Sequence, residues 1–153
     1  MDLVKFLADG TLLLIIAIGG YVVLRYIPWA QWRTMVPRLV MAGLTSLWIA
    51  KLLSLVYQPS LSRPFIERGM QAGAAFINNP GFPSDHMLLA VVIVGATYMV
   101  SRYKAVLYGM AVITIVMGIA RVVALVHTPL DIVGGIACGL FGMLWYSKHD
   151  RHI

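Results

Sequence analysis

The chain alternates between long apolar stretches and short polar connections. Five apolar segments stand out, at residues 10–27, 37–57, 86–101, 105–126 and 129–147. Each has about 16 to 22 residues, and at about 1.5 Å of helical rise per residue this approaches the length that crosses a bilayer core of about 30 Å. The pattern therefore predicts an all-α integral membrane protein. We expect a bundle of about five transmembrane helices in a single domain covering residues 1–153.

The connection at residues 58–83 differs from the others. Its 26 residues are too many for a simple helix–helix loop, and long structured loops tend to carry function. Apolar residues recur in it at roughly helical spacing between Phe65 and Ile77, and Pro64 suits the first turn of a helix. We predict an interfacial amphipathic helix within 58–83 that lies on the membrane. An irregular loop is the alternative that the pattern leaves open.

Composition supports a membrane location. Hydrophobic residues make up 60% of the chain, charged residues only 12%, and the mean hydropathy is +0.84. Soluble domains are about a quarter charged, so lipid must solvate most of the exterior here. The net charge of +6 is better explained by loops facing anionic lipid than by a nucleic-acid partner. The single cysteine, Cys138, can form no internal disulfide and does not indicate a compartment.

The distribution of basic residues predicts the orientation. Five spans place the N-terminus, the 58–83 connection and the turn at His127 on one side of the membrane, here called the site side. This side carries five basic residues, three of which belong to the candidate site described below. The opposite side carries seven: Arg25, Arg33, Arg38, Arg102, Lys104, Lys148 and Arg151. The positive-inside rule makes the opposite side cytoplasmic, so the site is expected to face outward.

A set of ionisable residues gathers at or near the ends of the apolar segments on the site side. Each is costly in a membrane and is therefore a functional candidate. Lys51 ends the second segment, and Arg63 follows it. His86 opens the third segment, and Arg121 lies near the end of the fourth. His127 and Asp131 stand at the start of the fifth.

These residues favour phosphate chemistry. Lys51, Arg63 and Arg121 are three cations without a comparable set of intramembrane carboxylates, so they need an anion, and arginine suits phosphate geometry. Ser84 is a plausible N-cap for the helix that begins at Asp85. The N-terminus of such a helix offers free N–H groups and a positive dipole end to a phosphate.

The two histidines suit covalent catalysis. His127 and Asp131 are four residues apart across a helix start, so the carboxylate can hold one imidazole nitrogen and leave the other free. A nucleophilic histidine needs this arrangement. His86 is then available as acid and base. The sequence shows no evident metal-ligand cluster, and we expect no cofactor.

Three short motifs resemble the signatures of the type 2 phosphatidic acid phosphatase superfamily. Phe82-Pro83-Ser84-Asp85-His86 resembles the second signature motif and Arg121-x5-His127-x3-Asp131 the third, while Arg63-Pro64 matches the end of the first. The resemblance implies a metal-independent lipid phosphatase. It implies that His127 attacks phosphorus and forms a phosphohistidine, that Asp131 orients it, and that His86 protonates the departing oxygen and later activates water. It further implies that the phosphoryl oxygens are held by Lys51, Arg63, Ser84 and Arg121.

Two departures from the family pattern point to a subfamily and raise a question. The second motif reads Ser-Asp-His where Ser-Gly-His is commoner, and Asp85 together with Arg63-Pro64-Phe65 resembles bacterial undecaprenyl-diphosphatases of the bacitracin-resistance type. This implies hydrolysis of undecaprenyl diphosphate in the bacterial cytoplasmic membrane. Lys51 precedes Arg63 by twelve positions where the family usually has seven, which leaves its role open. Asp85 is a possible accessory residue that caps the helix, contacts Arg63 or tunes the site.

Other functions are consistent with parts of the pattern. The same chemistry could act on phosphatidylglycerol phosphate, phosphatidic acid or phosphorylated lipid A, so the partner is an isoprenoid or phospholipid phosphate within membrane lipid. A small anion transporter or channel is an alternative of another class, but the charges form one layer rather than a path across the membrane. A purely structural subunit would not need three cations and two histidines. The sequence does not indicate an oligomeric state.

Overall fold

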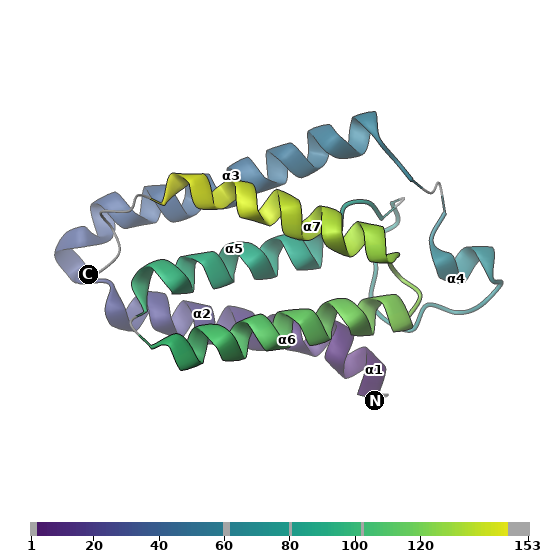
Figure 1. Cartoon of the computed structure of the whole chain (residues 1–153), viewed down its shortest axis with the longest axis horizontal. Helices are drawn as coiled ribbons and strands as arrows, with labels where there is room; N and C mark the ends of the chain where they lie inside the picture. Colours follow the sequence, from purple (N-terminus) through teal and green to yellow (C-terminus); the bar gives the residue numbers. More distant parts are fainter. Residues whose placement is uncertain (1–2, 60–61, 80, 102, 147–153) are drawn as a thin grey trace.

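The computed structural model describes residues 3–59, 62–79, 81–101 and 103–146, and every regular element within them is helical. Five long helices lie alongside one another in a bundle (Figure 1). They are α2 (Thr11–Tyr26), α3 (Trp32–Val56), α5 (Asp85–Val100), α6 (Lys104–Val123) and α7 (Pro129–Gly142). Short helical turns extend three of them: α1 (Leu3–Lys5) with the π-helical η1 (Phe6–Gly10) before α2, η2 (Trp29–Gln31) before α3 and η3 (Met143–Trp145) after α7.

Each predicted apolar segment overlaps one of these long helices, although α3 begins at Trp32, five residues before the predicted start. Among the described residues, three continuous helical stretches are long and apolar enough to cross a membrane: Leu3–Tyr26, Trp29–Val56 and Lys104–Val123. The stretches at α5 and α7 fall in a shorter class. At about 1.5 Å per residue, the 16 residues of α5 extend about 24 Å, less than a bilayer core of about 30 Å. The helical bundle is therefore confirmed, whereas five complete crossings remain a prediction.

The described helices and loops are arranged as the up-and-down topology requires. The N-terminal end, α4 (Pro64–Glu67) and the start of α7 gather at one end of the bundle (Figure 1). Helix α5 packs against α2, α3, α6 and α7 and occupies the middle of the bundle. Several residues discussed from the sequence lie outside the described residues, namely Arg102, Ser147, Lys148 and Arg151.

The prediction of an interfacial amphipathic helix within 58–83 was wrong. The only helix described there, α4, begins at Pro64 as expected but lasts a single turn. Gly69 follows with a φ of +61°, a left-handed conformation that ends a helix. Beyond it the backbone bonds to other parts of the molecule, as where the N–H of Gly73 donates to the carbonyl of Ala124 at 3.1 Å. These tertiary hydrogen bonds replace the internal ones that a helix would have made.

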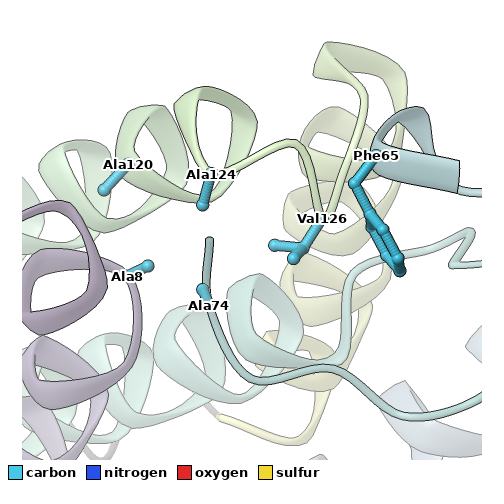
Figure 2. Packing of buried hydrophobic residues seen from close by; sticks show 6 residues of the cluster. All are labelled: Ala8, Phe65, Ala74, Ala120, Ala124 and Val126. Atoms are coloured by element: carbon cyan, nitrogen blue, oxygen red, sulfur yellow. The ribbon is translucent and has the colours of Figure 1, made fainter. Parts of the chain in front are cut away.

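A cluster of small apolar side chains fixes this loop to the end of α6. Figure 2 shows the cluster between the N-terminal helix, the loop and the residues that follow α6. It consists of Ala8, Phe65, Ala74, Ala120, Ala124 and Val126. The N–H of Phe65 also donates to the carbonyl of Leu125 at 3.0 Å. The loop is thereby held directly beside His127, the next residue after the cluster.

The glycine face of α7 permits close helix packing. A Cβ on Gly135 would lie 2.5 Å from the carbonyl oxygen of Ser84, and one on Gly139 would lie 2.8 Å from Cβ of Val91. Because only glycine fits there, α7 approaches the backbone of α5. The N–H of Ser84 then donates to the carbonyl of Asp131 at 3.0 Å, which joins the start of α5 to the first turn of α7.

Candidate active site

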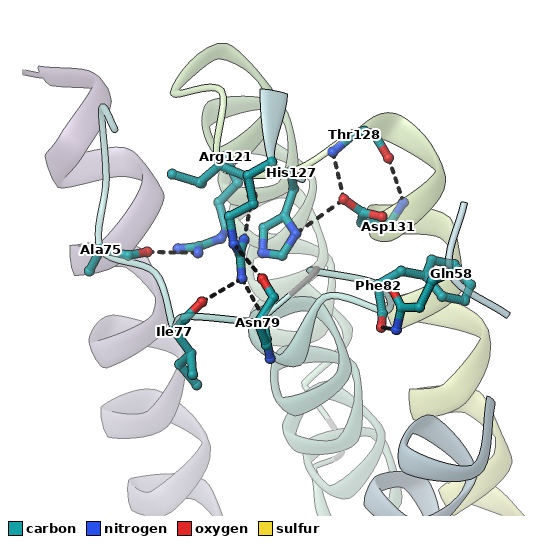
Figure 3. A network of polar contacts seen from close by, with 11 residues as sticks. Gln58, Ala75, Ile77, Asn79, Phe82, Arg121, His127, Thr128 and Asp131 are labelled. Carbon is teal, nitrogen blue, oxygen red and sulfur yellow. Dashed lines mark hydrogen bonds and ion pairs between the residues drawn. The ribbon is translucent and has the colours of Figure 1, made fainter. Parts of the chain in front are cut away.

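Asp131 holds His127 through the cap of helix α7. The N–H of Asp131 donates to Oγ1 of Thr128 at 3.2 Å, and the N–H of Thr128 donates to Oδ2 of Asp131 at 2.7 Å, which together form a capping box. The same Oδ2 lies 3.4 Å from Nδ1 of His127 (Figure 3). The spacing of four therefore does bring these two residues together, and Nε2 is the nitrogen that remains available.

The surroundings of His127 favour its neutral form. The side chain is only 4% exposed, and this burial lowers the pKa of His127 below its usual value. The hydrogen bond that His127 donates to Asp131 opposes the shift, while the positive charges of Arg121 and Arg63 lower the pKa further. An imidazole that is neutral near pH 7 has a free electron pair for nucleophilic attack.

Arg121 is bound by a carboxylate that the sequence argument overlooked. One guanidinium nitrogen, Nη1, donates to Oδ1 of Asp9 at 3.0 Å and to the carbonyl of Ala8 at 3.3 Å. The other, Nη2, donates to the carbonyl of Ala75 at 2.9 Å (Figure 3). Arg121 is 1% exposed, and its Nε has no partner among the described residues. The expectation that the cations lack nearby carboxylates is thus corrected, because Asp9 neutralises Arg121.

Arg63 binds protein oxygens on every side. Its Nε donates to the carbonyl of Asn79 at 3.2 Å, and its Nη2 donates to the carbonyl of Ile77 at 3.0 Å and to Oδ1 of Asn79 at 2.7 Å. Its Nη1 donates to the carbonyl of Val126, next to His127. The geometry therefore makes Arg63 a tie between the loop and the histidine turn, with its hydrogen-bonding groups already in use.

Ser84 occupies the N-cap position of α5, but its side chain does not cap the helix. Its hydroxyl is completely buried and has no partner among the described residues. A buried polar group without a partner is unfavourable, so this hydroxyl suits a ligand atom. The first N–H groups of α5 likewise have no acceptor within the helix. Unpaired N–H groups at a helix start are a setting in which proteins commonly bind anions.

The two histidines face one small cavity. This cavity, of about 20 Å³, is lined by Arg63, Ile77, Asn79, Gly81, Asp85, His86, Arg121 and His127. Lys51 does not line it. Lys51 lines a second cavity, of about 120 Å³, whose wall also includes Gln58, Asn79, Gly81 and Asp85. Asp85 therefore borders both cavities, and Lys51 stands on the far side of it from the histidines.

A long apolar groove begins next to this site. It has a volume of about 780 Å³ and runs between α5, α6 and α7. Met87 and Pro129, which follow His86 and Thr128 in the chain, line one part, and Tyr98 and Leu107 at the other end of α5 and α6 line another. The groove therefore runs from the starts of α5 and α7, the end of the bundle where the histidines lie, along most of the length of these helices.

Three contributors to the site were missed from the sequence. Thr128 had a readable signal, since a Thr three residues before an acidic residue and an apolar run is a helix-start pattern. Asp9 had a weaker one, as a carboxylate at the edge of an apolar segment on the site side. Asn79 had none, because both its main-chain carbonyl and its side-chain oxygen meet Arg63 only through the tertiary structure. Within the described part of the chain, no three metal-binding side chains gather as a metal site.

Comparison with protein families agrees with this geometry. Residues 12–152 match the family model of the PAP2 superfamily. The chain belongs to the PAP2 superfamily. Members of the PAP2 superfamily are phosphatases, and membership gives this chain a hydrolase activity directed at lipid phosphates. Neither the curated proteins nor the solved structures gave a significant match. All seven residues predicted to bind phosphate or react lie within the PAP2 match, whereas Asp9 lies before it.

Proposed function

We propose that this protein removes the terminal phosphate of undecaprenyl diphosphate and leaves undecaprenyl phosphate. The observation that carries the proposal is the convergence on one cavity of His127, His86 and Arg121, with the unpartnered Ser84 hydroxyl at the adjacent helix start. Two histidines beside donors for an oxyanion meet the needs of phosphoryl transfer through a covalent intermediate.

The proposed reaction has two steps. Nε2 of His127 attacks the terminal phosphorus, and the bond from phosphorus to the bridging oxygen breaks as His86 gives that oxygen a proton. His86 then takes a proton from water, whose oxygen attacks the phosphohistidine and releases inorganic phosphate and free His127. Asp131 stays on Nδ1 throughout and stabilises the positive charge that develops on the ring. The step requires no metal ion.

The remaining polar groups of the site bind different parts of the diphosphate. Arg121 Nε, the Ser84 hydroxyl and the first N–H groups of α5 bind oxygens of the transferred phosphoryl group. Lys51, across Asp85 in the adjoining cavity, neutralises the phosphate that stays on the lipid. Arg63 supports the site by holding the loop against the histidine turn.

The groove and the orientation support a membrane lipid as substrate. An apolar groove of about 780 Å³ that starts beside the histidines suits a hydrocarbon chain attached to the phosphate. We place the enzyme in the bacterial cytoplasmic membrane with this site on the outer side, on the distribution of basic residues.

Phosphate release from a panel of lipids tests the proposal. Purified protein in detergent with EDTA should act on undecaprenyl diphosphate more efficiently than on phosphatidylglycerol phosphate or phosphatidic acid. His127→Ala should abolish turnover while its melting temperature stays close to that of the wild type. A preference for a glycerophospholipid phosphate would contradict the substrate, and strict dependence on a metal ion would contradict the mechanism.

A further inference from the structure

Asp9 lies where the N-terminal helix, the loop and α6 meet. Its Oδ1 accepts a hydrogen bond from Nη1 of Arg121 at 3.0 Å, and its Oδ2 accepts one from the N–H of Ala75 at 2.9 Å. Arg121 also donates to the carbonyl of Ala75 at 2.9 Å, so the three residues close a ring of hydrogen bonds. Asp9 thus binds both a site residue and the loop that covers the site.

The backbone at Asp9 is specialised. Asp9 belongs to η1, a π-helical turn (Phe6–Gly10) within an otherwise α-helical stretch. Single π-turns within helices are rare and often occur at functional sites. Asp9 is part of none of the motifs discussed above, and it lies before the residues matched by the PAP2 superfamily.

The contacts of Asp9 determine which atom Arg121 can offer to a ligand. Asp9 and Ala8 occupy Nη1, and Ala75 occupies Nη2. Rotation of the guanidinium would break these bonds in a buried setting. Nε therefore remains as the nitrogen without a partner among the described residues, on a side chain that lines the cavity with His86 and His127. Figure 3 shows Arg121 beside His127, with its far end turned toward Ala75.

We propose that Asp9 is a positioning residue for phosphoryl transfer, which fixes Arg121 so that its Nε–H meets the phosphoryl group. This rests on the proposed function, since it takes Arg121 as a phosphate ligand. Charge and geometry both contribute: the carboxylate attracts Arg121, and its second oxygen holds the loop at Ala75. A displacement of a catalytic group by about 1 Å can lower a rate about 100-fold.

Two substitutions separate the contributions. Asp9→Asn keeps a carbonyl oxygen for one of the two bonds but removes the charge, and we expect kcat/KM to fall about tenfold. Asp9→Ala removes both bonds, and we expect a fall of about 100-fold. Lys5→Gln is the matched control, because Lys5 is an exposed residue one turn earlier on the same helical stretch, and it should leave kcat/KM within about twofold of the wild type.

Inhibition by orthovanadate distinguishes positioning from mere folding support. This anion imitates the phosphoryl group in transfer, so a misplaced Arg121 should raise its inhibition constant in parallel with the loss of kcat/KM. A smaller folded fraction would lower the maximal rate and leave the inhibition constant unchanged. In an Arg121→Lys background, Asp9→Asn should have little further effect, because the two residues act as a unit.

The outcomes separate this inference from the proposed function. A wild-type protein without activity on any lipid phosphate overturns the proposed function. An active wild type whose Asp9→Asn variant matches Lys5→Gln in kcat/KM and in vanadate inhibition overturns the role of Asp9. If Asp9→Ala does not fold, Asp9→Asn and its double variant with Arg121→Lys still decide the question.

Discussion

At the scale of single residues, the main feature is how differently the cations are employed. Arg121 is neutralised by Asp9, and Arg63 is bound to carbonyl oxygens and Asn79. Lys51 is exposed, and among the described residues no hydrogen bond or ion pair is found to its side-chain ammonium group. Three positive charges that look equivalent in the sequence are thus an oriented donor, a structural tie and a free charge.

The pH dependence of kcat/KM should reflect the protonation of His127. Burial and the neighbouring arginines lower the pKa of His127 below its usual value of about 6.5. Since the neutral form is the nucleophile, kcat/KM should stay constant as pH falls to 6.5 and decline only when pH passes the lowered pKa. Titration of the substrate phosphate by ³¹P NMR in the same detergent supplies the control. A decline in kcat/KM that begins at or above pH 6.5 and does not coincide with titration of the substrate phosphate would contradict this prediction.

Lys51 should discriminate diphosphates from monophosphates. Because Lys51 lines the cavity beyond Asp85, Lys51→Met should raise KM for a lipid diphosphate by about tenfold, as expected for a lost charged hydrogen bond. KM for the corresponding monophosphate should change little. Lys104→Met, at an exposed lysine where α6 begins, is the matched control. Equal effects of Lys51→Met on both substrates would place Lys51 at the transferred phosphate instead.

At the scale of elements, the site depends on how closely α7 approaches α5. Glycines along α7 allow the first turn of α7 to accept a hydrogen bond from Ser84, so the second and third motifs meet through backbone contact. The same packing places the unpartnered Ser84 hydroxyl near the histidine turn. The position of Ser84 relative to the first turn of α7 is therefore set by helix packing.

Gly135→Ala should therefore lower both stability and activity. The added methyl group would lie 2.5 Å from the Ser84 carbonyl and 2.9 Å from Cβ of Met87, so the helices must separate. We expect a destabilisation of about 1–3 kcal/mol, read as a lower melting temperature in detergent, with a fall in kcat. Gly109→Ala is the control, since nothing lies within 4 Å of its Cβ position and alanine favours helix. Equal melting temperatures for the two variants would contradict the packing argument.

Helices and motif spacings could be predicted from the sequence, but the loop and its contacts could not. Continuous apolar stretches located the five helices, periodicity was used only within 58–83, and the offset of four between His127 and Asp131 indicated their contact. The same periodicity wrongly predicted a helix after Pro64, because it cannot register hydrogen bonds to distant carbonyls. Arg63 and Arg121 bind such carbonyls. Because almost every residue type has the same main-chain carbonyl, the sequence does not reveal which of them will accept these bonds. The partnership of Asp9 and Arg121 depends on tertiary structure in the same way.

At the scale of the whole molecule, one end of the bundle carries the chemistry. The loop, the N-terminal end and the histidine turn all lie at that end (Figure 1). The far end of α5 and the start of α6 lie away from it. An asymmetric molecule of this kind has a defined direction in a membrane, which solution assays in detergent cannot detect.

Cysteine labelling in intact cells should reveal that direction. Ile66 in the loop and Tyr103 between α5 and α6 are 55% and 59% exposed, so they form a matched pair, and the native Cys138 is buried. With Cys138→Ala as background, a membrane-impermeant maleimide should label Ile66→Cys and leave Tyr103→Cys unlabelled until the cells are permeabilised. The reverse pattern would place the site on the cytoplasmic side.

The groove between α5, α6 and α7 has a kinetic consequence. Since it is apolar and extends from the histidines along the bundle, a lipid substrate would reach the site sideways, from within the bilayer. The concentration that governs the rate is then the mole fraction of substrate among the surrounding lipids, not its amount per volume of solution. Adding more buffer to mixed micelles should leave the rate per enzyme unchanged, while adding more detergent at constant volume should slow it.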